Sequence, residues 1–332
     1  MRQRWPDEPA LRGRGPSRAP RPMGDKGGGM ITAQAEVKCG DVAAHYDDLD
    51  RFYREVWGEH VHHGLWSSGR ETPEEATRRL IAVVAEQAAL RPGDTVCDVG
   101  CGYGGTARVL AGEYGARVTA LTVSRAQHAH AVSLDPAAAN PTYLLRDWLE
   151  NGLASESFDA VIAIESSEHM ADLAAFFAEA SRVLKPGGRF VVCAWLTRER
   201  PRLWEARLLL EPICREGRLR GMGSAEDYHR LARAAGLAPV TFRDVSRQVE
   251  RTWSICMRRV AIGLLREPSY RRFLLRGGKP APELRPHAAA APARLCAGEH
   301  AVRDLDGRQV PRGGGRRGWL LRGIAHRRGI GH

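Results

Sequence analysis

The chain of 332 residues lacks several features that would define other classes of protein. Its seven cysteines include no C-x-x-C pair and are odd in number. No apolar run is long enough to cross a bilayer, and no apolar core of a secretory signal follows the N-terminus. A disulfide framework, a transmembrane segment and an export signal are therefore not expected. We predict a reduced, cytoplasmic protein in which cysteines serve as small apolar residues.

The body of the chain also lacks net charge. The formal charge is +11, but residues 1–29 carry seven Lys/Arg against three Asp/Glu, and residues 277–332 carry eleven against four. The segment between them carries equal numbers of basic and acidic residues. Nucleic-acid binding requires basic residues clustered on a folded face, so no nucleic-acid partner is expected. Both tails are rich in Arg, Gly and Pro without periodicity, and we expect both to be disordered.

What the sequence does contain is a strand, a glycine-rich turn and a helix in succession. Residues 94–99 form a short β-prone apolar run, and residues 106–111 resume a helical pattern. Between them, glycines at Gly100, Gly102 and Gly104 let the backbone turn sharply and approach a ligand. A nucleotide-like ligand meets the carboxyl edge of an open α/β sheet at such a turn. The glycine spacing alone also fits a dehydrogenase.

Asp98 separates these two interpretations. A carboxylate directly before the glycines is a poor neighbour for a pyrophosphate but suits a cationic ligand that carries hydroxyls and an amine. The next strand ends in Thr122, where a dehydrogenase would have Asp or Glu for its ribose hydroxyls. A dehydrogenase is therefore disfavoured. The run Asp98-x-Gly100-x-Gly102-x-Gly104 resembles the first motif of the class I S-adenosylmethionine-dependent methyltransferases.

This resemblance implies a Rossmann-like α/β fold, in which helices flank a mostly parallel sheet, and S-adenosylmethionine as cofactor. In the family the glycine loop packs against the methionine part of the cofactor. Residues 182–188, Arg-Val-Leu-Lys-Pro-Gly-Gly, resemble a late motif of the same family that forms a tight turn between a helix and a strand.

Residues 57–66 narrow the resemblance to a subgroup. They follow a predicted helix over residues 41–56 and resemble the N-terminal lid of the tocopherol-type, sugar O- and isoprenoid methyltransferases. The resemblance implies that the lid covers the cofactor and lines the substrate chamber, and we assign Tyr46 and Trp57 to the first role and His63 and Trp66 to the second. The histidines of the segment lack a cluster of Cys or carboxylate ligands, so no metal site is predicted.

Further cofactor contacts are implied at the ends of the next two strands. Thr122, Ser124 and Gln127 match a Thr-x-Ser-x-x-Gln pattern of the subgroup and are expected beside the ribose or adenosine. Helix capping alone would also explain Ser124. Asp147 and Trp148 follow the strand predicted for 142–145, and the resemblance assigns them to the adenine. An Asp at this position is equally typical of a turn.

The chemistry is expected after the strand predicted for residues 158–164. The segment Glu165-Ser-Ser-Glu168-His169-Met resembles the subgroup's segment after this strand, in which a histidine often serves as base or orients the substrate. His169 has an ordinary pKa suited to a base near neutrality. Glu165 and Glu168 are the second candidates. Trp195, which ends the strand predicted for 189–195, is placed on the substrate side.

The resemblance implies a division of the chain into four segments. The lid covers 41–70, the cofactor core 75–198, a helical insertion 199–236, and the sixth strand with a long helix 237–276, all within a methyltransferase domain over 30–276. We find no pattern for the antiparallel strand that normally closes the family's sheet. A reading-frame change or a divergent tail after residue 276 would explain this, and a chain without the strand would leave the sixth strand's edge unpaired.

We therefore predict methyl transfer to a small-molecule acceptor, most simply O-methylation of a secondary metabolite, quinol or sugar hydroxyl with His169 as base. The first alternative is C-methylation of an isoprenoid or alkene, in which Glu165 or Glu168 stabilises a carbocation. The second is a non-catalytic methyltransferase-like protein with a defective C-terminus. No oligomeric state is predicted.

Overall fold

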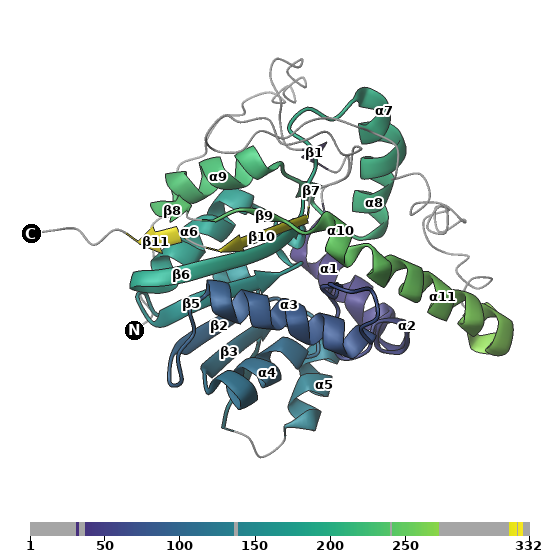
Figure 1. Ribbon diagram of the computed structural model, residues 1–332, viewed down its shortest axis with the longest axis horizontal. Helices are drawn as coiled ribbons and strands as arrows, with labels where there is room; N and C mark the ends of the chain where they lie inside the picture. Colours follow the sequence, from purple (N-terminus) through teal and green to yellow (C-terminus); the bar gives the residue numbers. More distant parts are fainter. Residues whose placement is uncertain are drawn as a thin grey trace, which may run out of the picture.

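A seven-stranded sheet forms the centre of the computed structural model (Figure 1). The structure describes residues 31–32, 37–135, 139–239, 241–271, 319–323 and 325–327. The strand order is β4 (Thr142–Leu145), β3 (Arg117–Thr122), β2 (Thr95–Val99), β5 (Phe158–Ile164), β6 (Leu184–Trp195), β10 (Trp319–Gly323) and β9 (Arg243–Asp244). The first five strands are parallel. This confirms the predicted Rossmann-like, mostly parallel sheet.

The strand order reverses between β2 and β5. From β2 the chain adds strands outward to β4 on one side, and from β5 it adds β6 on the other. Ligands of open α/β sheets bind outside the carboxyl ends of the strands at such a reversal. The glycine turn follows β2 and the segment of Glu165 to His169 follows β5. The two predicted site segments therefore lie side by side.

The sheet also contains the strand for which we found no sequence pattern. Backbone pairing places β10 antiparallel between β6 and β9, with Trp319 opposite Trp195 and Leu320 opposite Asp244. The expectation of a sheet without its last strand is thus corrected. Residues 1–29, and those of 277–332 outside 319–323 and 325–327, lie outside the described residues, as does the disorder predicted there.

Helices cover both faces of the sheet because its strands are apolar on both faces. In β2, Val96 packs into one cluster, whereas Cys97 and Val99 pack into the other. The first cluster contains residues of α3 (Pro73–Gln87), α4 (Gly105–Tyr114) and α10 (Ser246–Val249), and the second contains residues of α6 (Leu173–Val183) and α9 (Ala225–Ala234). The sheet with its two helical layers forms a rigid support for the loops at the carboxyl ends of the strands.

The lid begins with two short helices, α1 (Cys39–Asp48) and α2 (Asp50–Val56), which meet at Leu49. The single helix predicted for 41–56 is therefore divided. Asp47 fastens the lid to α5 (Arg125–Leu134), because its Oδ1 accepts hydrogen bonds from the Ser124 hydroxyl at 2.5 Å and from the Ala126 amide at 3.0 Å. Tyr103 adds a second anchor by donating to Asp50 at 3.0 Å.

The insertion after β6 is largely helical, as predicted. It contains α7 (Leu203–Glu205), the π-helical η3 (Ala206–Leu210), α8 (Glu211–Glu216) and, after the short strand β7 (Gly221–Met222), α9. Strand β7 pairs with β1 (Ile31–Thr32). The predicted sixth strand is divided into β8 (Leu237–Pro239), which pairs with β11 (Ala325–Arg327), and β9.

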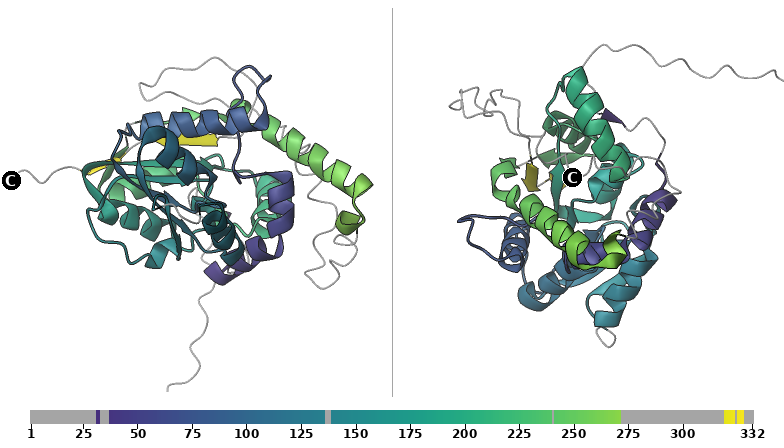
Figure 2. Two further views of the ribbon diagram at one scale, coloured as in Figure 1. Left: turned by 90° about the horizontal axis from the view of Figure 1, so that it is seen from below. Right: turned by 90° about the vertical axis from the view of Figure 1, so that its right-hand side faces the viewer.

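The long helix predicted within 237–276 is α11 (Arg251–Arg266), which follows the short α10 and projects from the body (Figure 1 and Figure 2). Among the described helices, none is both long and apolar enough to cross a membrane.

Candidate active site

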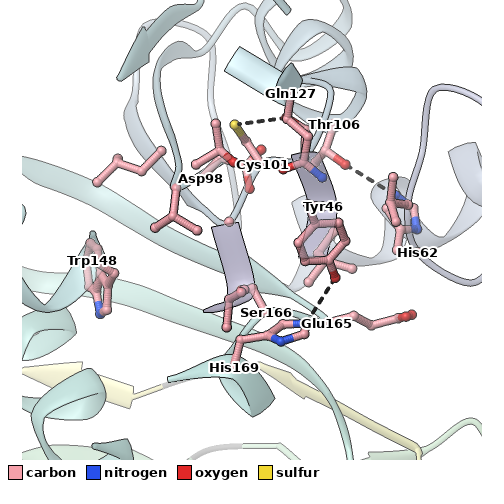
Figure 3. A pocket seen from close by; sticks show the side chains of 18 of the residues that line it. Tyr46, His62, Asp98, Cys101, Thr106, Gln127, Trp148, Glu165, Ser166 and His169 are labelled. Carbon is pink, nitrogen blue, oxygen red and sulfur yellow. Dashed lines mark hydrogen bonds between the residues drawn. The ribbon is translucent and has the colours of Figure 1, made fainter. Parts of the chain in front are cut away.

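A cavity opens at the carboxyl ends of β2, β3 and β5, beneath the lid helix α1 (Figure 3). The space inside it, including open solvent at the mouth, is about 1010 Å³. Ten of the predicted site residues line it: Tyr46, Asp98, Gly100, Gly102, Thr122, Gln127, Asp147, Trp148, Glu165 and His169.

The glycine turn forms one wall of this cavity, and its glycines are required for different reasons. Gly100 has φ +76°, and a Cβ there would lie 2.4 Å from the Cβ of Ser166. Gly104, the residue before α4, has φ +78°, and a Cβ there would lie 2.6 Å from the Tyr143 ring. A side chain at Gly102 would meet only Val61, at 3.8 Å. The turn therefore brings bare backbone to the cavity at Gly100 and Gly102, while Gly104 packs behind it.

Asp98 lies beside this turn and is the most unusual polar group of the cavity. It is 2% exposed, and its Oδ2 has no hydrogen-bond partner among the described residues. Burial raises the pKa of this carboxyl from 3.8 to about 7. A buried acceptor without a donor is costly unless a ligand supplies the donor. An ammonium group, such as that of S-adenosylmethionine, fits this requirement, and the bare backbone beside it leaves room for one.

The polar residues after β3 divide between the cavity and the lid. Thr122 lines the cavity and donates to the Oε1 of Gln127 at 2.8 Å, which fixes both side chains. Ser124 does not line the cavity. It caps α5 by accepting from the Gln127 amide at 3.1 Å, and its hydroxyl donates to Asp47 in the lid. Helix capping, the alternative considered from the sequence, describes its contacts here.

Asp147 and Trp148 form the opposite end of the cavity, where η1 (Trp148–Glu150) begins. Asp147 accepts from the Leu149 amide at 2.9 Å, so it is a turn residue as well as a cavity residue. The Trp148 ring is 2% exposed and donates to the Phe176 carbonyl at 3.2 Å. Burial raises the pKa of the neighbouring Cys39 thiol to about 12, and a hydrogen bond with Asp147 adds to this effect.

His169 ends the short helix η2 (Ser167–His169), and both of its ring nitrogens are engaged. Nδ1 lies 3.2 Å from the Arg218 carbonyl, and Nε2 lies 3.0 Å from the Tyr46 hydroxyl. A carbonyl can only accept, so Nδ1 carries the proton and Nε2 accepts from Tyr46. Burial lowers the pKa of His169 to about 4. The imidazole is therefore neutral at pH 7, with a lone pair on the nitrogen that faces the lid.

Glu165 directly follows β5 and lies in the left-handed region at φ +53°. Its carboxylate accepts from the His63 amide at 2.8 Å, from His63 Nδ1 at 2.9 Å and from Trp195 Nε1 at 3.2 Å. Burial alone would raise the pKa of Glu165, but the charge and hydrogen bonds of His63 outweigh it and lower the pKa. Glu165 therefore presents an ionised carboxylate to the cavity, held from behind by His63.

Glu168 is in a different environment. It is 4% exposed and does not line the cavity, and it accepts from the Trp195 amide at 2.6 Å and from the Ser167 hydroxyl at 3.0 Å. Burial raises the pKa of Glu168 to about 7, even though the Trp195 amide favours the ionised form. This carboxyl thus titrates near neutrality within the wall of the site.

Apart from Tyr46, the aromatic residues predicted for the lid lie behind the cavity rather than on it. The fully buried His63 ring lies 5.3 Å from the ring centroids of both Trp57 and Trp253, and 5.5 Å from that of Trp195. Trp66 is 6% exposed and donates to the Thr252 hydroxyl at 2.9 Å. These rings form a packed wall that fixes Glu165.

Several cavity residues were not predicted from the sequence as parts of the site. They include Cys39, Val42, His60, Val61, His62, Arg146 and Met170. His60 and His62 belong to the lid motif, and that motif could have indicated them. Burial lowers the pKa of both histidines. Within the described residues, no group of three or more His, Cys, Asp or Glu is arranged to hold a metal ion.

Comparisons with known proteins agree with this geometry. The family model described as mycolic acid cyclopropane synthetase matches residues 33–257. The tocopherol O-methyltransferase of Arabidopsis thaliana is 31% identical over 65% of this chain and 68% of its own length. The 27-O-demethylrifamycin SV methyltransferase of Amycolatopsis mediterranei is 32% identical over 64% of this chain and 79% of its own. The crystal structure of mycolic acid cyclopropane synthase CmaA1 complexed with SAH and CTAB superposes with a TM-score of 0.61, at 25% identity, covering 72% of this chain and 91% of that one.

Proposed function

Because the chain belongs to the mycolic acid cyclopropane synthetase family and is an S-adenosylmethionine-dependent methyltransferase of small molecules, we propose that it methylates a hydroxyl group. The acceptor would be a secondary metabolite, a quinol or a sugar, and His169 would be the base. One observation carries this proposal: a neutral imidazole with an acceptor nitrogen lines the cavity after β5. The proposal is further supported by the two relatives whose names describe O-methylation.

The cofactor is proposed to lie over the glycine turn. Its ammonium group would meet the orphaned Oδ2 of Asp98, and its ribose would lie near Thr122 and Gln127. The adenine would lie between Asp147 and Trp148. When bound, S-adenosylmethionine supplies an electrophilic methyl group on a sulfonium. The protein's contribution is then to align the acceptor with that methyl group and to remove the acceptor's proton.

His169 suits this task despite its low pKa. A hydroxyl that receives a methyl group becomes strongly acidic, so even an imidazole with a pKa of about 4 can accept its proton. The Arg218 carbonyl holds the tautomer that keeps Nε2 free of a proton. Tyr46 donates to this nitrogen, so an acceptor hydroxyl has to replace the Tyr46 hydroxyl or hydrogen-bond beside it. The lid therefore controls access to the base.

A second candidate reaction is C-methylation of an isoprenoid or alkene. Glu165 favours it, because an ionised carboxylate at the cavity wall can stabilise a developing carbocation. Glu168 is less suited because it lies behind the wall and titrates near pH 7. In this reaction His169 would be secondary.

Product analysis distinguishes the two reactions. Full-length protein is incubated with S-adenosylmethionine carrying a ¹³C-methyl group and with a panel of hydroquinones, phenols and prenylated alkenes. We expect an O–¹³CH₃ signal by NMR, and a product methylated only on carbon would overturn O-methylation. In the same assay His169→Ala should lower kcat about 10²-fold, because general-base catalysis is lost while positioning remains. His229→Ala, a histidine outside the cavity lining, is the matched control.

Two further proposals concern the setting of the enzyme. We propose a reducing, cytoplasmic compartment, supported by the free thiols of all six cysteines within the described residues. We also propose that no nucleic acid is bound. The chain is proposed to be organised as a lid over 41–70, a cofactor core over 75–198 and a helical insertion over 199–236, within a domain of residues 30–276.

A further inference from the structure

The helical insertion has an outer face that the proposed methyl transfer does not use. Residues 203–216, comprising α7, η3 and α8, are called the cap helix here. Leu203, Trp204 and Leu208 on its outer face are 75%, 41% and 65% exposed. They are three of the nine large apolar residues that are exposed in the described part of the chain. Such a concentration on one short helix indicates a contact surface rather than scattered exposure.

Arginines predominate among the fully exposed charged residues around these apolar side chains. Five exposed arginines lie on or beside the cap helix: Arg200, Arg202, Arg207, Arg215 and Arg218. Glu199 is the one exposed carboxylate of residues 198–218, because Glu205 is buried and the other acids of the segment are partly buried. With its six arginines and four glutamates, the segment 198–218 carries a net charge of +2, whereas the body of the protein carries none.

The inner face of the cap helix is held firmly against the body. Leu209 and Cys214 are buried, and Cys214 packs with Leu219 and Met222 against Trp195. The outer residues are thus presented by an anchored helix. Figure 1 and Figure 2 show this helix at the periphery of the molecule, away from α5.

The segment that follows the cap helix contacts the catalytic region directly. The Arg218 carbonyl lies 3.2 Å from His169 Nδ1, and the Arg220 amide donates to the Glu168 carbonyl at 2.9 Å. Trp195, which packs against the inner face, donates to Glu165. Whatever binds the outer face is therefore held next to the acceptor side of the cavity.

We propose that the cap helix docks on an anionic membrane surface, with Leu203, Trp204 and Leu208 entering the interface and the arginines contacting lipid headgroups. A helix with an apolar edge and flanking Arg lies in the interfacial plane, where Trp is favoured. Anionic lipid supplies charge that complements exposed arginines such as Arg200 and Arg207. This inference rests on the proposed function: a protein docked in this orientation would let a lipophilic acceptor enter the cavity from the bilayer.

The test is co-sedimentation of full-length protein with vesicles of phosphatidylcholine containing 30% phosphatidylglycerol, compared with phosphatidylcholine alone. We expect binding to the anionic vesicles that weakens at 0.5 M salt. Leu203→Asp with Leu208→Asp should lower partitioning at least about tenfold. Arg200→Gln with Arg207→Gln should lower it about 25-fold at low salt, at about fivefold per arginine. Leu134→Asp on α5, where the leucine is 44% exposed, is the matched control and should bind like wild type.

Three outcomes would overturn the docking surface: no binding of the wild type to anionic vesicles, unchanged binding of the leucine variant, or an equal loss in the Leu134 control. Vesicle binding that depends on the arginines but not on the leucines would indicate a purely electrostatic contact with polyanions, and it would also overturn the proposed docking surface. Each variant is titrated with S-adenosylhomocysteine. Retained affinity shows that the fold is intact, whereas absent binding in all proteins, wild type included, would refute the methyltransferase site independently of the vesicle result.

Discussion

Replacing Asp98 with asparagine should stabilise the protein without ligand and weaken its binding of cofactor. The carboxyl is 2% exposed, and its Oδ2 has no partner among the described residues, so the folded state holds a carboxylate with little solvation. Asparagine has the same shape and no charge. It therefore removes the cost of burying the charge, together with the attraction for an ammonium group.

The sign and size of the effect follow from the pKa of Asp98. Burial raises it from 3.8 to about 7, so the folded protein binds this proton more tightly than the unfolded chain. The stability associated with the proton is complete below pH 3.8 and is lost as the pH rises through about 7. A pKa difference of about 3, at about 1.4 kcal/mol per unit, gives about 4 kcal/mol at pH 8. Water entering through the cavity makes this an upper limit, and we expect about 1–4 kcal/mol.

Urea unfolding at pH 5 and pH 8, with and without S-adenosylhomocysteine, measures the effect. Without ligand, Asp98→Asn should be more stable than wild type at pH 8, and the difference should shrink at pH 5. Its affinity for S-adenosylhomocysteine should be about tenfold to a hundredfold weaker, because hydrogen bonds to charged groups contribute about 1.5–3 kcal/mol. Glu168→Gln is the comparison, since the pKa of Glu168 is also about 7 but the residue does not line the cavity.

Glu168→Gln should change the pH dependence of stability in the same direction and leave the affinity unchanged. A stability difference between Asp98→Asn and wild type that is equal at both pH values would refute the reasoning about burial. Undiminished affinity in Asp98→Asn would refute the contact with the ammonium group.

The remaining predictions concern the turn and the lid. Gly100→Ala should lower the free energy of unfolding by about 1–3 kcal/mol in urea titrations, because Gly100 has φ +76° and an added Cβ would clash with Ser166. Gly112→Ala is the control: it lies in a helix with open space around it and should raise the free energy of unfolding by about 0.5–1 kcal/mol. Equal effects of the two substitutions would contradict this prediction. Asp47→Ala should increase hydrogen exchange in α1 and α5, because two hydrogen bonds between lid and core are lost, whereas the exposed Asp48→Ala should not. Tyr46→Phe should raise kcat/KM for the acceptor two- to tenfold in the methyl-transfer assay, because the acceptor hydroxyl no longer has to displace one hydrogen bond to His169 Nε2, and an unchanged kcat/KM would separate Tyr46 from the base.

The parts of the fold that depend on local pattern could be predicted from the sequence. The strands over 142–145 and 158–164 have the predicted bounds, and the helical pattern predicted over 106–111 lies within α4, because apolar runs and glycine turns specify these elements locally. Asp98 and His169 were placed at the cavity by the same reasoning, since the ends of parallel strands meet at one edge of the sheet.

Features that depend on distant contacts could not be predicted. β10 is a five-residue strand that pairs with β6, more than a hundred residues earlier in the chain, and no local pattern indicates it. The pKa of His169 was expected near its ordinary value, but burial beneath Tyr46 lowers it to about 4. Glu168 and Trp195 belong to the predicted segments, but they do not line the cavity. Glu168 bonds with Ser167 and Trp195 bonds with Glu165 and Glu168, and these contacts within the fold decide which way each side chain points.

The most direct test of the account is a calorimetric titration of the full-length protein with S-adenosylhomocysteine, with NAD as the control ligand. We expect micromolar binding of S-adenosylhomocysteine with one site per chain and no heat of binding for NAD, because Asp98 and Thr122 favour an amine-bearing ligand over a pyrophosphate. Absence of S-adenosylhomocysteine binding by a protein that unfolds cooperatively, or tight binding of NAD, would contradict it.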